Sequence, residues 1–296
     1  MNLALHRFAV FTACATFCLI VAGALVTSNE AGLAVPDWPL SYGSLTPPWV
    51  GNIRYEHGHR MVATFVGFLT VCLALWLWRR EERHWVRRLG WAALAVVVAQ
   101  GLLGGITVLF FLPTAISVGH ACLAQAFFCL TITLALVTGR DWEQEPVRAP
   151  DRGLPLLAQL ASITVASIFF QLMLGAALRH KGFGIVPHLA GAAVVTGFVI
   201  WTVYRVVSRH ADQPGLLRPA GVLGLLLFAQ LILGVGSYLV REATRDAAQP
   251  QRIMVWITVA HVGTGALTLA SSLWLTLQAR RLLVVQAREG AVLIPT

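Results

Sequence analysis

The chain has 296 residues, of which 57% are hydrophobic and only 12% are charged, and its mean hydropathy is +0.72. An average soluble domain carries about 25% charged residues, so the composition excludes a soluble protein and indicates an integral membrane protein. The net charge of +9 needs no nucleic-acid partner to explain it, because cytoplasmic loops of membrane proteins accumulate Lys and Arg, which also attract anionic lipid headgroups.

Eight apolar stretches are each long enough for a transmembrane helix, which needs about 20 residues. The predicted spans are residues 8–27, 58–78, 89–110, 117–138, 156–177, 186–207, 220–240 and 254–277. The first is predicted to be a retained span, since neither a convincing signal-peptide cleavage site nor an organelle-import leader is present. With the N-terminus inside, fifteen of the 22 Lys and Arg residues, from Arg7 to Arg288, fall in inner segments. Both termini are therefore predicted to be cytoplasmic, in a bacterial plasma membrane that the chain crosses several times.

A polar segment, "GRDWEQEPVRAPDRG" at residues 139–153, divides the spans into two sets of four that resemble each other. "AQGLLGG" (99–105) corresponds to "AQLILGV" (229–235), and "ISVGHACL" (116–123) corresponds to "ITVAHVGT" (257–264). The predicted fold is all-α, with eight transmembrane helices as two pseudo-symmetric four-helix bundles in residues 1–145 and 146–296. The small residues Gly101, Gly104, Gly105, Gly234 and Gly236 are expected to allow close helix contact.

Several polar residue types are expected to play ordinary structural roles. The cysteines Cys14, Cys18, Cys72, Cys122 and Cys129 all lie in predicted spans and are expected to be small buried side chains, with none in an outer loop for a disulfide. His6, His84 and His210 fall in or next to inner segments and His180 falls in an outer loop, so all four are expected to be solvated.

The remaining span-borne histidines carry the functional prediction. His59, His120, His188 and His261 each lie near the start of an even-numbered span, and all these spans run from outside to inside. An ionisable side chain inside a membrane is costly, so a functional role is the default hypothesis, although interhelical hydrogen bonding would explain one such histidine alone. Two histidines facing each other in a four-helix bundle can supply both axial ligands of a haem.

We therefore predict two haem sites, His59 with His120 and His188 with His261. A zinc site fits less well, because zinc is held by three or four clustered ligands. The outer basic residues are candidates to pair with haem propionates, although a solvated role is equally consistent with the sequence. They include Arg54, Arg60, Arg179, Lys181 and Arg241.

The stretch "NIRYEHGHR" (52–60) distinguishes the two halves. His57 and His59 are about 200° apart around a helix, so only one of them can face the bundle axis, whereas Glu56 and His59 share a face. The corresponding "GIVPHLAG" has no carboxylate before His188. A carboxylate beside a haem indicates a site of chemistry, and a haem without one indicates an electron carrier. A salt bridge from Glu56 to Arg54 or Arg60 is the equally weighted alternative.

These features together resemble the haem A synthase family, whose members oxidise a methyl group of haem O, through an alcohol, to the formyl group of haem A for terminal oxidases. The resemblance covers the eight spans, the repeat, the four histidines, the E-x-x-H of Glu56 to His59, and the first outer loop "TSNEAGLAVPDWPLSYGSLTPPW". It implies that His188 and His261 hold a resident haem B, that His59 and His120 flank the substrate haem O, and that Glu56 is the essential carboxylate. Some members carry a cysteine pair in that loop, which this chain lacks.

The sequence leaves several alternatives open. If both His59 and His120 bind iron, no coordination position remains for dioxygen, so either one ligand leaves during turnover or the oxidation follows another route. A two-haem b-type cytochrome acting only in electron transfer is the main rival function, and a repeat-built transporter is less consistent with histidines near the outer face.

Partners and the first outer loop are also left open by the sequence. The expected partners are haem O, membrane lipid and an unidentified electron donor. By analogy with the family, haem O synthase and oxidase assembly factors are further candidate partners. Whether the chain forms a homo-oligomer is left open by the sequence. The loop either anchors the chain at the interface or covers the substrate haem as a lid.

Overall fold

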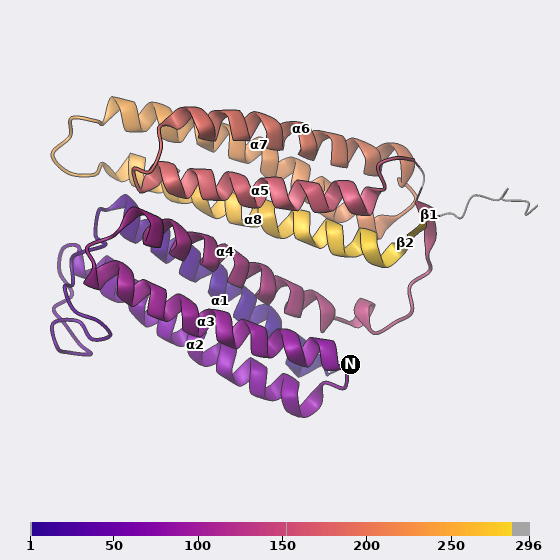
Figure 1. Ribbon diagram of the computed structural model, residues 1–296, viewed down its shortest axis with the longest axis horizontal. Coiled ribbons are helices and arrows are strands. Elements are labelled where there is room, and N and C mark those ends of the chain that lie inside the picture. The colour runs from indigo at the N-terminus through magenta and orange to yellow at the C-terminus, as the bar shows by residue number, and fades with distance from the viewer. Residues whose placement is uncertain (1, 152, 286–296) are drawn as a thin grey trace, which may run out of the picture.

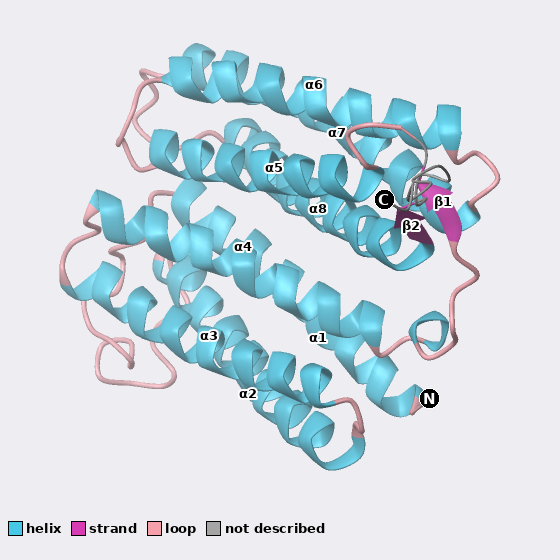
Figure 2. Ribbon diagram, turned by 45° about the vertical axis from the view of Figure 1, so that its right-hand side comes forward, coloured by secondary structure: helices cyan, strands magenta, loops and turns pink. Residues whose placement is uncertain are grey.

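The computed structural model describes residues 2–151 and 153–285, and within them the regular secondary structure is helical apart from two short strands (Figure 2). Arg152 and Arg288, which are among the basic residues assigned to inner segments, lie outside the described residues. The elements are α1 (Leu3–Ser28), α2 (Ile53–Arg80), α3 (His84–Leu109), α4 (Thr114–Val137), η1 (Arg140–Trp142), β1 (Ala149–Asp151), α5 (Leu157–Arg179), α6 (Ile185–Arg209), α7 (Pro214–Ala243), α8 (Arg252–Leu282) and β2 (Leu283–Val285).

All eight α-helices are long and apolar enough to cross a membrane, which confirms the eight predicted spans. The helices run beyond the apolar stretches because polar residues continue them, as Arg79 and Arg80 do at the end of α2. Large apolar side chains lie on the outside, including Phe68, Leu225 and Phe228, which are 63%, 69% and 64% exposed. Such outward-facing apolar surface is what a helix presents to lipid, which offers its backbone no hydrogen-bonding partner.

The helices form two groups of four, each arranged as a ring in which neighbours in sequence pack together. Helices α1–α4 lie in the lower half of Figure 1 and α5–α8 in the upper half, and the last helix of each group closes on the first. Large buried side chains fill each ring, such as Leu73 and Phe127 in the first and Leu223 and Leu269 in the second. The groups meet where α1 and α4 pack on α5 and α8, around Phe128.

The segments that connect the helices lie at the two opposite ends of the molecule. Residues 29–52, 110–113, 180–184 and 244–251 connect helices at one end, here called the loop end, at the left of Figure 1. The N-terminus, the segment between α4 and α5, and both strands lie at the opposite end, here called the linker end. Helices α2, α4, α6 and α8 therefore all begin at the loop end and run parallel.

The linker end contains a small polar core that the sequence did not predict. Strand β1 pairs in parallel with β2, so the segment between the two groups lies beside the end of α8. The Asp151 carboxylate accepts a hydrogen bond from the Leu157 N–H at 2.7 Å and lies 3.6 Å from Nε2 of His210. His210 is only 2% exposed. The prediction that His210 is solvated was therefore wrong, because the linker folds over the end of α6.

The cysteines also differ from expectation. Cys14 and Cys18 are exposed and Cys72, Cys122 and Cys129 are half-buried, and these five thiols are free. The prediction of buried cysteines was wrong because apolar composition marks a membrane-spanning helix without telling its core face from its lipid face.

Candidate haem-binding sites

The four span-borne histidines lie within the first three turns of α2, α4, α6 and α8, and each ring packs against a glycine of the preceding helix. A Cβ added at any of these glycines would approach the Cε1 atom of the histidine ring to 3.1–3.2 Å. The pairs are Gly23 with His59, Gly104 with His120, Gly175 with His188 and Gly234 with His261. The glycines therefore make room for imidazole rings. Gly101, by contrast, would meet nothing within 4 Å, so the expected close helix contact does not explain it.

His188 and His261 face each other across the second group of helices. Their ring centroids are 6.4 Å apart and their ring planes make an angle of 80°. An imidazole nitrogen binds a metal at about 2.0–2.1 Å, so two rings on opposite sides of one metal ion have centroids about 6 Å apart. The separation fits one haem iron with two axial histidines. Among the described residues, no three His, Cys, Asp or Glu side chains form a group that could hold a metal ion, which argues against zinc.

His59 and His120 occupy equivalent positions in the first group, each packed against a glycine of the preceding helix. The Nδ1 atoms of both rings are buried without a hydrogen-bond partner in the described part of the chain, as is Nδ1 of His261. Buried polar atoms are normally paired, so unpaired ring nitrogens mark positions where a ligand would complete the contacts. Both pairs therefore suit haem in their donor atoms, and the helices around them supply the apolar surroundings that a porphyrin needs.

Three glutamines, which sequence reasoning missed, contact three of the four histidines. Nε2 of Gln100 donates to the His120 carbonyl at 3.0 Å, and Nε2 of Gln171 donates to the His188 carbonyl at 2.8 Å. The amide of Gln230 lies 3.4 Å from Nε2 of His261. Each glutamine stands one helical turn before the glycine that faces the same histidine, and this Q-x-x-x-G spacing was the signal that could have revealed them.

Glu56 is buried at the loop end, with both carboxylate oxygens engaged. Oε1 accepts from Nη2 of Arg60 at 2.6 Å, and Oε2 accepts from the Val35 N–H at 2.8 Å. Arg60 also donates to the carbonyls of Asp37 and Leu40. The ion pair considered from the sequence therefore exists with Arg60, and it holds the first outer loop. Within the described residues, no hydrogen bond joins Glu56 to His59.

The first outer loop folds onto the start of α2 and onto α3. Oγ of Ser41 lies 2.9 Å from Nδ1 of His57, so His57 faces the loop, as the helical spacing from His59 requires. The Asp37 carboxylate accepts from the Tyr42 and Gly43 N–H groups at 2.7 and 2.8 Å. These contacts, that of Gly43 foremost, hold the pKa of Asp37 below its usual value. The loop thus has a defined turn of its own.

The indole of Trp38, in the first outer loop, packs against Gly105 of α3. This contact can be tested. A Cβ at Gly105 would lie 2.6 Å from Cδ2 of Trp38, so Gly105→Ala is expected to displace the indole and destabilise the protein by about 1–3 kcal/mol, the usual cost of overpacking. Gly101→Ala, one turn earlier on the same helix, is the matched control because it meets nothing within 4 Å. Thermal unfolding in detergent measures both, and equal melting temperatures would contradict the Trp38 contact.

The candidate propionate partners divide into engaged and exposed residues. Nη2 of Arg179 donates to Oγ of Ser28 at 2.8 Å and to the Ala24 carbonyl at 3.2 Å, which joins α5 to α1. Arg60 is held by the loop as described. The others are exposed, namely Arg54, Lys181 and Arg241.

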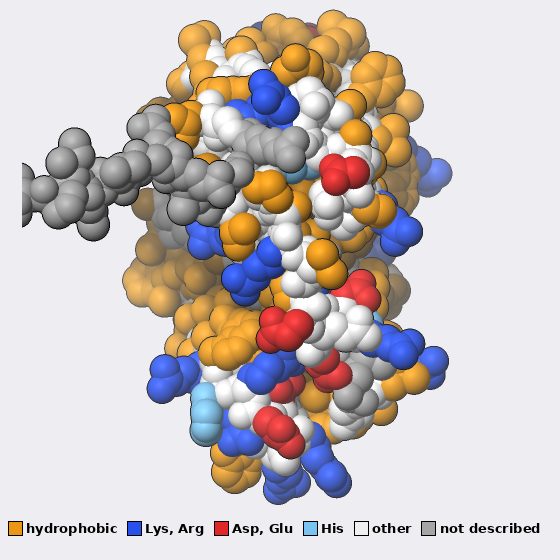
Figure 3. Space-filling model, turned by 90° about the vertical axis from the view of Figure 1, so that its right-hand side faces the viewer, with side chains coloured by type: hydrophobic (Ala, Val, Ile, Leu, Met, Phe, Trp, Pro, Cys, Tyr) orange, Lys and Arg blue, Asp and Glu red, His pale blue; other side chains and the backbone are white. Residues whose placement is uncertain are grey.

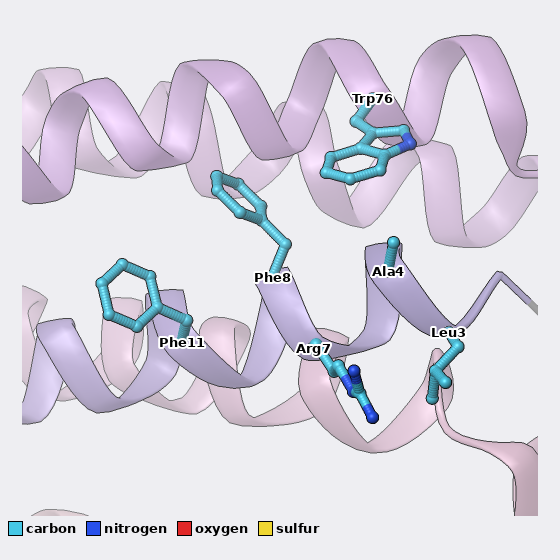
Figure 4. Close-up of a pocket in the computed structure, with 6 residues that line it drawn as sticks. All are labelled: Leu3, Ala4, Arg7, Phe8, Phe11 and Trp76. Carbon is cyan, nitrogen blue, oxygen red and sulfur yellow. The ribbon is translucent and has the colours of Figure 1, made fainter.

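Two surface pockets do not involve the histidines. One of about 550 Å³ opens between α1 and α2 at the linker end, where Arg7, Phe8 and Trp76 lie on its wall (Figure 4). Another of about 260 Å³ lies between α1 and α8, beside Phe17 and Trp256. The candidate sites therefore rest on the chemistry of the histidines and not on these hollows.

Fold and site together define a class: a multi-pass helical membrane protein with two histidine pairs suited to haem. Residues 52–189, which include Glu56, His59, His120 and His188, match the COX15-CtaA family, described as cytochrome oxidase assembly protein. A haem A synthase of Alkalihalophilus pseudofirmus is 31% identical over 240 residues, covering 79% of this chain and 76% of the relative. One of Symbiobacterium thermophilum is 28% identical over 225 residues, covering 65% and 73% respectively. The chain belongs to the haem A synthase family.

Proposed function

We propose that this protein is a haem A synthase, a membrane enzyme that oxidises the methyl group of haem O, by way of an alcohol, to the formyl group of haem A. Relatives named haem A synthase match it over most of their length. The observation that carries the proposal is the difference between two otherwise similar histidine pairs. Within residues 2–151 and 153–285, a buried carboxylate, Glu56, and a folded loop accompany the pair of His59 and His120 and not the pair of His188 and His261.

The two pairs are assigned different haems. His188 and His261 would hold a resident haem B, which supplies electron transfer when bound. His59 and His120 would flank the iron of the substrate haem O, with the first outer loop as a lid over it. Glu56 would take the protons released at the methyl carbon, on a carboxylate lone pair that neither Arg60 nor the Val35 N–H occupies.

The proposed organisation follows the grouping of the helices. Residues 1–145 form the substrate half and residues 146–296 the cofactor half, as pseudo-symmetric bundles related by the sequence repeat. Arginine side chains gather on the linker end, which faces the viewer in Figure 3, and this supports cytoplasmic termini under the positive-inside rule. The histidines would then lie toward the outer face of a bacterial plasma membrane.

Partners follow from the reaction and from the family. Haem O is the substrate, membrane lipid surrounds the helices, and a separate, unidentified electron donor supplies electrons to the cycle. The matched family is described as cytochrome oxidase assembly protein, which supports contact with haem O synthase or an oxidase assembly factor. Assembly of the chain as a homo-oligomer belongs to the same proposal.

The test is chromatographic identification of haems extracted from protein purified from cells that supply haem O. The wild type is expected to contain haem B together with haem A or its hydroxylated precursor, and Glu56→Ala is expected to accumulate haem O, because the proton acceptor is lost. If both proteins contain only haem B, at two per chain, the protein is an electron-carrying cytochrome and the proposal fails.

A further inference from the structure

We propose that Arg179 binds a propionate of the resident haem and that its positive charge favours the reduced state of that haem. This assignment rests on the proposed function, in which His188 and His261 hold haem B, and it names the residue that recognises the charged groups of the cofactor. It is carried by a single charged side chain at a position that is uncharged on the three corresponding helices.

Arg179 is the last residue of α5 and lies one helical turn, about 6 Å, beyond Gly175 toward the loop end. Gly175 packs against the ring of His188, since a Cβ there would lie 3.1 Å from Cε1. At the same spacing, the three other glycines that face a histidine are followed by Thr27, Val108 and Tyr238. A cation therefore stands one turn beyond the histidine contact on α5 and at none of the equivalent positions.

The guanidinium of Arg179 is half-buried and only partly satisfied by the protein. Nη2 donates to Oγ of Ser28 at 2.8 Å and to the Ala24 carbonyl at 3.2 Å, and both acceptors are uncharged. Among residues 2–151 and 153–285, no ion pair joins Arg179 to a carboxylate. A guanidinium has five N–H donors, so Nε and Nη1 keep donors for a further acceptor.

A cation that is partly withdrawn from water calls for an anion, because burial of a charge is costly unless the charge is paired. The propionates of the resident haem would supply this anion. A hydrogen bond from a guanidinium to a carboxylate is among the strong ones, because both partners are charged. Ser28 and Ala24 fix the guanidinium through Nη2, and its remaining N–H groups would hold the propionate.

A fixed positive charge at this place has a defined effect on the haem. Reduction of the iron from the ferric to the ferrous state takes one electron, which the proposed electron donor supplies. The added negative charge is stabilised by a cation close to it. The reduction potential of the resident haem is therefore higher with Arg179 than without it.

Midpoint potentials test this effect. The protein is prepared with His120→Ala, which removes a ligand of the substrate pair, so that the haem that remains is the one at His188 and His261. In this background, Arg179→Gln is expected to shift the potential to more negative values, and Arg179→Lys, which keeps the charge, should shift it less. Arg252→Gln is the matched control, because Arg252 is exposed at the loop end, at the start of the helix that carries His261. It should leave the potential unchanged.

A change in the cofactor tests the same contact without relying on how the variants of Arg179 fold. Haem B or its dimethyl ester, in which both propionates are blocked, is loaded into protein made without haem. With Arg179 present, haem B is expected to bind about tenfold or more tightly than the ester, because the ester loses a hydrogen bond between charged groups. Arg179→Gln should reduce this difference, which gives the coupling between the residue and the propionate.

Two results would overturn the inference and leave the proposed function intact. One is equal binding of haem B and its ester when Arg179 is present. The other is an unchanged potential in a folded Arg179→Gln protein with a lowered melting temperature, which would mean that Arg179 only ties α5 to α1. A folded His120→Ala protein that retains no haem would instead count against the cofactor pair, and so against the proposed function itself.

Discussion

Replacing His261 by alanine is expected to remove haem B from the purified protein and to abolish formation of haem A. His188 and His261 are 6.4 Å apart between ring centroids, so under the proposed assignment the loss of one would leave the haem iron with a single axial ligand. Loss of an outer-shell partner alone weakens metal binding by about 10–100-fold, and loss of the ligand itself should cost at least as much. The haem content per chain, measured by absorbance of a pyridine extract, should fall while substrate-haem binding persists.

The matched control is His84→Ala, because His84 is exposed at the start of α3, at the linker end. It should leave both haem content and conversion unchanged. His188→Ala should reproduce the His261 result, since both residues belong to the same pair. Full retention of haem B in either variant of the pair would refute the assignment of the cofactor site.

Replacing Glu56 by glutamine is expected to lower conversion of haem O by about 10²–10⁴-fold, the usual contribution of a general acid or base. Glutamine preserves the side-chain length and can still accept from the Val35 N–H, which now donates to Oε2 at 2.8 Å. Because the variant also breaks the buried ion pair with Arg60, some loss of stability is expected, which the melting temperature measures. Single-turnover conversion with haem chromatography, beside thermal unfolding in detergent, gives both quantities.

The comparison variant for Glu56 is Arg60→Gln, which releases the loop carbonyls of Asp37 and Leu40 but leaves the carboxylate. Both variants break the buried ion pair, and Arg60→Gln also loses the hydrogen bonds to the loop carbonyls, so it should be the less stable of the two yet retain more conversion. Equal losses of conversion in the two variants would mean that Glu56 acts by anchoring the loop and does not handle protons.

The sequence predicted the helices well because a long apolar stretch is by itself enough to indicate a membrane-spanning helix. Eight apolar stretches became eight helices, since a backbone in lipid must satisfy its own hydrogen bonds and a helix does so locally. The four histidines were found for a related reason, as polar residues inside apolar spans. The centroid separation of His188 and His261 could not be read from spacing, because it depends on how α6 and α8 pack.

Other features depend on side chains that look ordinary in the sequence. Gln100, Gln171 and Gln230 were overlooked because an amide in a membrane helix often serves helix packing, and only the contact with histidine distinguishes them. His210 was expected to be solvated because a charged loop surrounds it, and the fold of the linker determined otherwise. The choice between Arg54 and Arg60 as partner of Glu56 likewise depended on the path of the loop.

The contact between each histidine and a glycine of the helix just before it has a consequence for biogenesis. Every such contact lies within a single helical hairpin, so it can form as soon as that hairpin has entered the bilayer, before later helices are synthesised. Contacts that are local in sequence form early and carry little cost of chain closure. Each histidine is thus positioned by the glycine of its own hairpin. A histidine pair forms when two successive hairpins pack together. The first pair lies entirely within α1–α4, so its assembly requires no residue of the second half of the chain.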